Sequence, residues 1–139
     1  MTEDTNSRKA ILVVDDDVTH LVYTQASLKD EYDVFTVKSG KEALEFLGKG
    51  QTIPDLILLD VLMPEMDGWT VFDKITDIAA YKFTPIIFYS SLEEAVAREK
   101  AYELGAFDYI TKPCKKAILM EKIKDSIYKA ELKKQHYGI

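Results

Sequence analysis

The sequence has little cysteine and no long apolar segment. Its 139 residues include a single cysteine, Cys114, so an internal disulfide is excluded. The longest apolar runs, such as Ala10–Val14 and Leu56–Leu59, are far shorter than the roughly 20 residues that cross a bilayer. Met1–Lys9 is polar and lacks the apolar stretch of a secretory signal. We therefore expect a cytoplasmic protein that does not insert into a membrane.

The chain also lacks an excess of basic residues. It holds 18 Lys and Arg against 24 Asp and Glu, which gives a formal net charge of −6. A general nucleic-acid binder needs a basic face to displace counterions from phosphates, so we expect no direct nucleic-acid partner. Hydrophobic residues make up 47% of the chain, which excludes disorder along its whole length. One compact domain fits this length and composition.

Short apolar runs alternate with longer amphipathic segments. Most of the runs are continuous and several are rich in β-branched residues, as expected of strands buried on both faces of a parallel sheet. The expected strands are Ala10–Val14, Tyr32–Val37, Leu56–Leu59, Ile86–Tyr89 and Asp108–Ile110. We divide the chain into a flexible N-terminal tail (1–9), one domain (10–130) and a C-terminal helix end or tail (131–139).

Helical patterns lie between and after these runs. Two of the helices carry the spacing of a capping box, Ser39 with Glu42 and Ser91 with Glu94. Five strands alternating with five helices favour an α/β fold, a parallel sheet with helices on both faces. The expected helices follow Asp15–Asp17, run from Ser39 to near Gly48, from about Trp69 to Ile78, from Ser91 to Gly105, and onward from near Lys115.

Polar residues stand where the strands end. Asp15 and Asp16 follow the first strand, Asp60 the third, Ser90 the fourth and Lys112 the fifth. In an open α/β sheet these ends share one edge, where ligands bind. Three converging carboxylates would repel one another unless a dication lay between them, and Mg²⁺ prefers oxygen ligands. We predict a Mg²⁺ site, which Mn²⁺ could also fill. A metal, a lysine, a hydroxyl and an aspartate are the parts of phosphoryl transfer to a carboxylate.

Four segments of the chain form an ordered pattern. They are Ile11–Asp16, Leu59–Gly68, Pro85–Ser90 and Gly105–Pro113. Their order and spacing, over roughly residues 9–130, resemble those of the receiver domains of two-component response regulators, of the single-domain chemotaxis-regulator type. The resemblance implies a flavodoxin-like, doubly wound fold with five parallel strands in the order 2-1-3-4-5 and five helices.

The same resemblance implies the roles of the site residues. Asp60 would accept a phosphoryl group from a histidine kinase or a phosphotransfer protein. Asp16 would bind Mg²⁺ directly, Asp15 would hold it through water, and the backbone carbonyl of Leu62 would add a ligand. Lys112 would pair with a phosphoryl oxygen. The protein would catalyse only its own phosphorylation and dephosphorylation, so it would not be an enzyme in the ordinary sense.

A switch is implied beside the phosphorylation site. Pro113 would be the family's cis-proline, Ser90 its switch hydroxyl and Tyr109 its switch aromatic, although a strand tyrosine can also be plain core. Ser90 would move toward the phosphoryl group and Tyr109 would fill the space that it leaves. That would alter the surface of the fourth helix, fifth strand and fifth helix for a downstream protein. The protein would be a monomer or a phosphorylation-dependent dimer.

Departures from the family pattern include two positions close to the site residues. Leu62 and Leu92 lie two residues after Asp60 and Ser90, where the family tunes loss of the phosphoryl group. Apolar side chains at these positions would not orient an attacking water. We therefore predict a long-lived phosphoaspartate.

Several alternatives remain at this point. Asp15-Asp16-Asp17-Val18-Thr19 matches the Asp-x-Asp-x-Thr motif of haloacid-dehalogenase-like phosphohydrolases, with Asp15 as nucleophile and Asp17 as acid/base. That family needs a later acidic pair at a strand end, whereas Glu121 and Asp125 fall within a predicted helix. The chain could also be an interaction module, or a receiver fragment of a hybrid kinase or a larger regulator. His20 has no partner pattern and receives no role.

Overall fold

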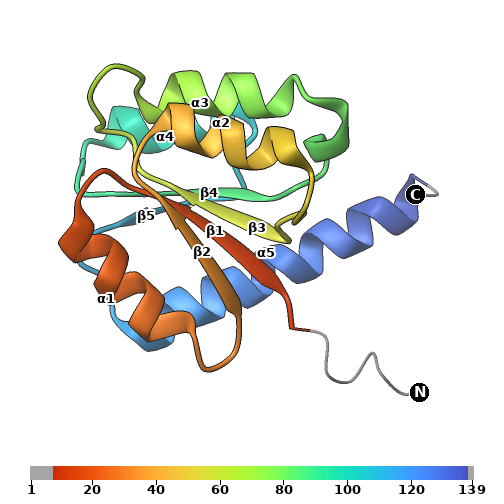
Figure 1. The fold of residues 1–139 in the computed structure, drawn as a ribbon, viewed down its shortest axis with the longest axis horizontal. Coiled ribbons are helices and arrows are strands. Elements are labelled where there is room, and N and C mark those ends of the chain that lie inside the picture. Colours follow the sequence, from red (N-terminus) through yellow and green to blue (C-terminus); the bar gives the residue numbers. More distant parts are fainter. Residues whose placement is uncertain (1–7, 138–139) are drawn as a thin grey trace.

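The computed structural model describes residues 8–137. Its five strands are parallel and lie in the order β2-β1-β3-β4-β5, which confirms the predicted α/β topology (Figure 1). In chain order the elements are β1 (Ala10–Val14), α1 (Val18–Leu28), β2 (Asp33–Val37), α2 (Gly40–Lys49), β3 (Leu56–Leu59), α3 (Gly68–Thr76), the short 3₁₀ helix η2 (Ala79–Tyr81), β4 (Ile86–Ser90), α4 (Ala95–Leu104), β5 (Asp108–Thr111) and α5 (Lys116–His136).

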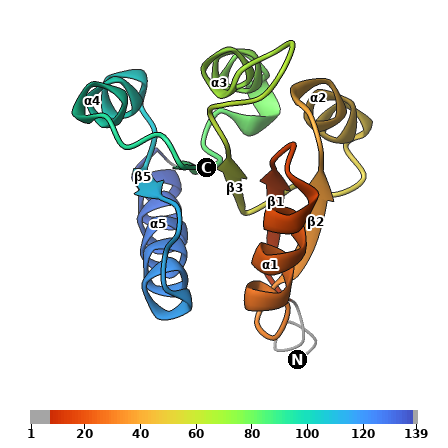
Figure 2. The same cartoon turned by 90° about the vertical axis from the view of Figure 1, so that its left-hand side faces the viewer.

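The molecule has three layers. Helices α2, α3 and α4 cover one face of the sheet, and α1 and α5 cover the other (Figures 1 and 2). Successive strand residues point to opposite faces, so each central strand feeds two cores. In β1, Leu12 and Val14 belong to the cluster under α2–α4, whereas Ile11 and Val13 belong to the cluster under α1 and α5. This burial on both faces explains why the strands are apolar throughout.

Helix α2 confirms both expected boundaries. The hydroxyl of Ser39 caps the helix by accepting the backbone N–H of Glu42 at 3.0 Å. The Glu42 carboxylate accepts the N–H of Lys38 at 2.8 Å, one residue earlier than a standard capping box requires. The helix ends at Lys49, one residue from Gly48, as expected. Gly50, with φ of 64°, takes the left-handed conformation that terminates it.

The capping box predicted for Ser91 and Glu94 is wrong. Helix α4 begins at Ala95 with Glu94 at its N-cap, and no side chain in the described part of the chain caps it. Other hydrogen bonds hold the preceding loop in place of a helix cap. The Leu92 N–H donates to the Ser90 hydroxyl at 3.3 Å, and the Leu92 carbonyl accepts from the Tyr109 hydroxyl. Gly105, with φ of 104°, ends the helix as predicted.

Three further segment ends bear on the expected boundaries. Helix α3 stops at Thr76, two residues before the expected end at Ile78, and the separate helix η2 follows from Ala79. Helix α5 continues to His136, so residues 131–136 form the end of this helix, and the division of the chain at residue 130 stays a prediction. The last two residues of the predicted N-terminal tail contact the domain. Arg8 donates to the Tyr32 carbonyl at 2.9 Å, and Lys9 forms an ion pair with Glu131 at 2.7 Å. Residues 1–7 and 138–139 lie outside the described part.

None of the helices between residues 8 and 137 combines the length and apolar character that a membrane span requires.

Candidate functional site

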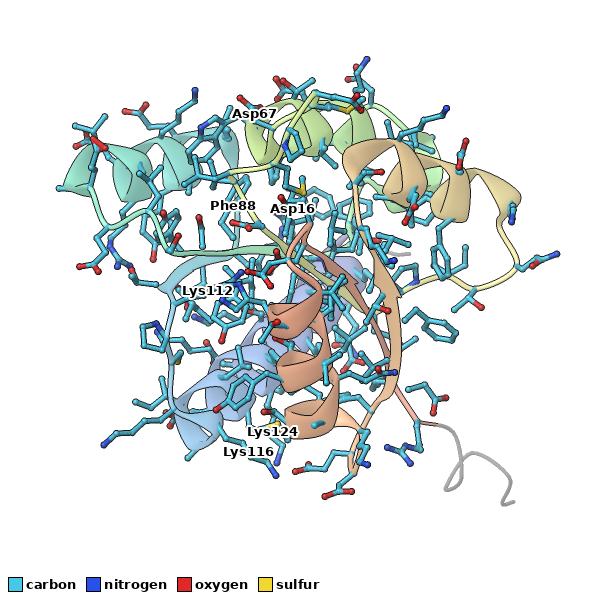
Figure 3. All side chains as sticks on the ribbon, turned by 60° about the vertical axis from the view of Figure 1, so that its left-hand side comes forward. Asp16, Asp67, Phe88, Lys112, Lys116 and Lys124 are labelled. Carbon is cyan, nitrogen blue, oxygen red and sulfur yellow. The ribbon has the colours of Figure 1, made fainter. Side chains whose placement is uncertain are left out.

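The sheet brings the predicted site residues to one edge. Asp15, Asp60 and Lys112 directly follow β1, β3 and β5, and Ser90 is the last residue of β4. The strands are parallel and in register, with Val14 opposite Leu59 and Ser90 opposite Thr111, so their carboxyl ends coincide. Topology alone therefore gathers residues that lie far apart in the sequence. Figure 3 shows Asp16 and Lys112 well separated from Lys116 and Lys124.

The loop after Asp60 folds back on the strand that carries it. Gly68, the first residue of α3, donates its N–H to the carbonyl of Val61 at 2.8 Å. A Cβ at Gly68 would lie 2.1 Å from the Asp60 carbonyl oxygen, so only glycine permits this approach. Asp67 caps α3 by accepting the N–H of Thr70 at 3.0 Å. These contacts fix the backbone at Asp60.

Three carboxylates form an acidic cluster. Asp15, Asp16 and Asp60 each offer an oxygen, and these oxygens lie within 4.8 Å of one another. Asp15 and Asp60 are buried, whereas Asp16 is exposed. An oxygen-rich cluster that is open on one side suits Mg²⁺, which keeps part of its water shell. The structure thus brings together the side chains predicted to hold the metal.

The Lys112 ammonium lies inside this cluster. It makes a close ion pair with Asp15, and its Nζ lies 3.6 Å from Asp60 Oδ2. It also lies 3.2 Å from His20 Nδ1 and 5.3 Å from the centre of the Tyr89 ring. The lysine side chain is only 8% exposed. Lys112 is therefore a buried cation held beside two buried carboxylates.

Asp60 is the least satisfied member of the cluster. Among residues 8–137, its Oδ1 is a buried side-chain oxygen without a hydrogen-bond partner. Burial raises the pKa of the Asp60 carboxyl; the Lys112 charge opposes this effect and the Asp15 charge adds to it. A buried carboxylate oxygen without a donor is costly unless another group binds it. This unpartnered oxygen fits a site that takes a cation and a phosphoryl group.

A second set of contacts leads from Ser90 to α4. The Ser90 hydroxyl accepts from Leu92 N–H, and the Leu92 carbonyl accepts from the hydroxyl of Tyr109. The Tyr109 side chain is fully buried in the core under α2–α4. Arg98 of α4 donates to the Tyr109 carbonyl at 2.8 Å, and its guanidinium carbon lies 5.2 Å from the Tyr109 ring centre. The loop, the strand and α4 are thereby connected.

The structure also describes Pro113 and Leu62, two residues that the family resemblance singled out. The Lys112–Pro113 peptide bond is cis, as the family resemblance implies. Leu62, whose carbonyl was predicted as a metal ligand, has an exposed side chain next to the site. Its role as a ligand stays a prediction.

Sequence reasoning missed two residues near the site. Asp17 caps α1 by accepting the N–H groups of Thr19 and His20, at 2.9 and 3.3 Å. His20 lies against Lys112, a contact across 92 positions that no local pattern could reveal. The Asp17 cap had a local signal, because an Asp before a helix is a favoured N-cap.

Comparison with known proteins is consistent across sequence and structure. Residues 11–124 match the response regulator receiver domain model. Response regulator PleD of Caulobacter vibrioides is 36% identical over 115 residues, which are 82% of this chain and 25% of PleD. The alkaline phosphatase synthesis transcriptional regulatory protein PhoP of Bacillus subtilis is 35% identical over 126 residues, 89% of this chain and 50% of PhoP. The chain thus spans only a quarter to a half of these relatives.

Solved structures show the same fold. The chemotaxis protein CheY4 of Vibrio cholerae superposes with a TM-score of 0.80 at 27% identity, covering 86% of this chain and 99% of CheY4. Together with the family match over most of the chain, this likeness settles the class. The chain belongs to the response regulator receiver domain family, the signal receivers of two-component phosphorelays.

Proposed function

We propose that Asp60 is the residue that accepts the phosphoryl group. The observation that carries this proposal is the buried Asp60 carboxylate, with one unpartnered oxygen and the Lys112 ammonium 3.6 Å from the other. Receiver domains interact with histidine kinases and downstream effectors. The donor would be a phosphohistidine on a histidine kinase or a phosphotransfer protein.

The transfer is a substitution at phosphorus. An Asp60 carboxylate oxygen attacks, and the new P–O bond forms as the donor's P–N bond breaks. The electron pair of the broken bond returns to the imidazole nitrogen, which takes up a proton from solvent. Lys112 stabilises the negative charge on the phosphoryl oxygens from a fixed position in a largely buried site. Asp60 must be ionised to attack, and the Lys112 charge favours that state.

The acidic cluster would hold the metal. Receiver domains bind Mg²⁺ at an acidic pocket, and here the ligands would be Asp15, Asp16, Asp60 and the Leu62 carbonyl, with Mn²⁺ as a substitute. Bound there, Mg²⁺ would neutralise part of the charge that a phosphoryl group brings. Asp15 already accepts the N–H of Asp17 at 2.9 Å and pairs with Lys112, which suits a ligand acting through water.

A small cavity supports approach of the donor from the side of α1. About 200 Å³ in volume and mostly apolar, it opens beside Lys112. A partner could cover it while presenting its phosphohistidine to Asp60. The residues lining it are His20, Tyr23, Thr24, Tyr89, Ser91, Lys112 and Pro113.

The output would pass through α4, β5 and α5. Phosphorylation adds charge and acceptor oxygens beside Ser90, whose hydroxyl would turn toward them. The Leu92 N–H would lose its partner, and the loop carrying the Leu92 carbonyl would shift against Tyr109 and Arg98. A downstream protein that binds one arrangement more tightly would read the change.

The phosphohydrolase alternative finds no support. Its acid/base, Asp17, is occupied as the N-cap of α1, and Asp15 is buried in an ion pair with Lys112. Glu121 and Asp125 lie within α5 and neither follows a strand along the chain, as the sequence indicated. Receiver domains are not a class of enzymes, and we propose that this chain catalyses only its own phosphorylation and dephosphorylation.

Intact-mass measurement after incubation with Mg²⁺ and acetyl phosphate tests the proposal. We expect the mass of one phosphoryl group on the wild type and none on Asp60→Asn. Omitting Mg²⁺ and adding a chelator should strongly reduce the adduct. An equal adduct on Asp60→Asn would show that another residue is the acceptor.

A further inference from the structure

We propose that His20 is a positioning residue for Lys112. Its imidazole holds the ammonium in the orientation that leaves one N–H for the group bound at Asp60. The inference rests on the proposed phosphorylation of Asp60. It assigns a role to a side chain that sequence patterns left without one.

The number of donors on the ammonium and the distances to its three polar neighbours carry the argument. A lysine ammonium has three donors and no acceptor. One donor faces Asp15 in the close ion pair, and the second faces His20 Nδ1 at 3.2 Å. Asp60 Oδ2, at 3.6 Å, lies beyond ordinary hydrogen-bond distance. With two bonds fixed, the third N–H is left for an oxygen placed between Lys112 and Asp60.

The contact between Lys112 Nζ and His20 Nδ1 indicates which ring nitrogen of His20 accepts a hydrogen bond. Because Lys112 can only donate, His20 Nδ1 accepts, and the ring proton is on Nε2. The side chain of His20 is 45% exposed, so Nε2–H can donate to water. The nearest oxygens of Asp15 and Asp17 lie 3.7 Å from Nδ1, farther than the ammonium.

The start of α1 places His20. Asp17 accepts the backbone N–H of His20 at 3.3 Å as part of the helix cap, which fixes the first turn beside the site. The Lys112 side chain is a flexible four-carbon stem, and a single ion pair would let its ammonium rotate. The Tyr89 ring, 5.3 Å from Nζ, limits movement on another side. His20 supplies the second directional bond.

Initial rates with acetyl phosphate test the role. This small donor reacts without docking on α1, so the rates report on the site itself. We would compare wild type, His20→Leu, His20→Asn and, as a control, Gln25→Leu, which places the same residue at an exposed position of α1. Asparagine is the matched rescue because its Oδ1 is the same number of bonds from Cα as His Nδ1.

We expect His20→Leu to lower the maximal rate about tenfold or more, the effect of losing one hydrogen bond to a charged group. The acetyl phosphate concentration at half-maximal rate should change less. His20→Asn should stay within about twofold of wild type, because one acceptor replaces another. Gln25→Leu should match wild type.

Two results would overturn the inference. One is a His20→Leu rate equal to that of wild type; the other is a His20→Asn rate as low as that of His20→Leu, which would indicate packing rather than hydrogen bonding. Far-UV circular dichroism checks folding, and His20→Met replaces the leucine variant if that variant unfolds. A reactive wild type with equally reactive variants overturns this inference alone. An unreactive wild type overturns the proposed function as well.

Discussion

Two regions at the same edge of the sheet are built in opposite ways. The proposed phosphorylation centre (Asp15, Asp60 and Lys112) buries three charges and leaves one carboxylate oxygen without a partner. The proposed relay (Ser90, Leu92, Tyr109 and Arg98) places a neutral buried serine and tyrosine in hydrogen bonds, and its one charged side chain, the exposed Arg98, donates to the Tyr109 carbonyl. Under the proposed function, the first region carries out chemistry at a cost in stability, and the second transmits a change of conformation. Variants in the centre should change reaction rates, and variants in the relay should change the response.

The largest effect is expected from removing the buried cation. Lys112→Met should lower the initial rate of phosphorylation by acetyl phosphate at least about 100-fold, as when one preorganised electrostatic group is removed from a transition state. Lys116→Met, at an exposed lysine of α5, is the matched control and should react like wild type. A rate for Lys112→Met within tenfold of wild type would mean that the centre does not depend on this charge.

The next effect concerns the lifetime of the phosphorylated form. Leu62 is 54% exposed beside Asp60, and Leu92 lies in the loop after Ser90; neither side chain can orient water. We expect the phosphoaspartate to outlast a minute after removal of the donor. The double variant Leu62→Asn, Leu92→Glu should speed its decay about tenfold or more, because polar groups can orient or deprotonate an attacking water. Loss of the phosphoryl group from the wild type within seconds to a minute, measured by intact mass, would contradict this prediction.

A smaller effect is expected on stability. Because the folded-state pKa of Asp60 is raised, the stabilisation from its protonated form is present below about pH 4 and lost as pH rises through the folded pKa. At neutral pH the ionised carboxylate therefore destabilises the fold. Without Mg²⁺ at pH 7.5, Asp60→Asn should raise the free energy of unfolding by about 1 kcal/mol, or Tm by about 4 °C.

Thermal unfolding followed by circular dichroism measures this shift. The exposed Asp16→Asn is the control and should shift Tm less. The advantage of Asp60→Asn should shrink as pH falls toward 4, since wild-type Asp60 then becomes protonated. A Tm for Asp60→Asn at or below that of wild type at pH 7.5 would argue against a strained centre.

The smallest effect on chemistry is expected in the relay. Tyr109→Phe and Arg98→Met should leave the phosphorylation rate within about twofold, because neither side chain lies among the buried charges. They should instead alter the amide chemical shifts that the beryllofluoride mimic induces in α4, β5 and α5. Arg98→Lys keeps the charge but loses the planar donor pair, so it separates charge from geometry. A tenfold loss of rate in Tyr109→Phe would erase the distinction between the two regions.

Much of the fold could be predicted because strands buried on both faces are apolar throughout. The limits of β1 and β3 were predicted to the residue, and those of β2, β4 and β5 to within one residue. Helix ends were harder. Gly48 and Gly50 are both plausible stops for α2, and only the backbone shows that Gly50 takes the left-handed conformation. The Ser91 pattern failed because Leu92 makes a local hydrogen bond with Ser90 and a tertiary one with Tyr109, which hold that loop away from helical geometry.

In the site, too, some residues could be predicted from the sequence and others could not. Its charged residues follow strand ends, and the parallel topology then forces them together. His20 lies in a helix, and its contact with Lys112 depends on how α1 packs against the end of β5. The Arg98 contacts likewise depend on the angle of α4. Contacts of this kind follow from packing, so composition and spacing do not reveal them.

Locating the acyl phosphate tests the central claim most directly. Borohydride reduces an aspartyl phosphate to homoserine, so protein treated with acetyl phosphate and Mg²⁺ would be reduced, digested and mapped by mass. We predict homoserine at position 60 and unchanged aspartate at positions 15 and 16. Homoserine at position 15 would contradict the account and would point instead to the phosphohydrolase-like nucleophile.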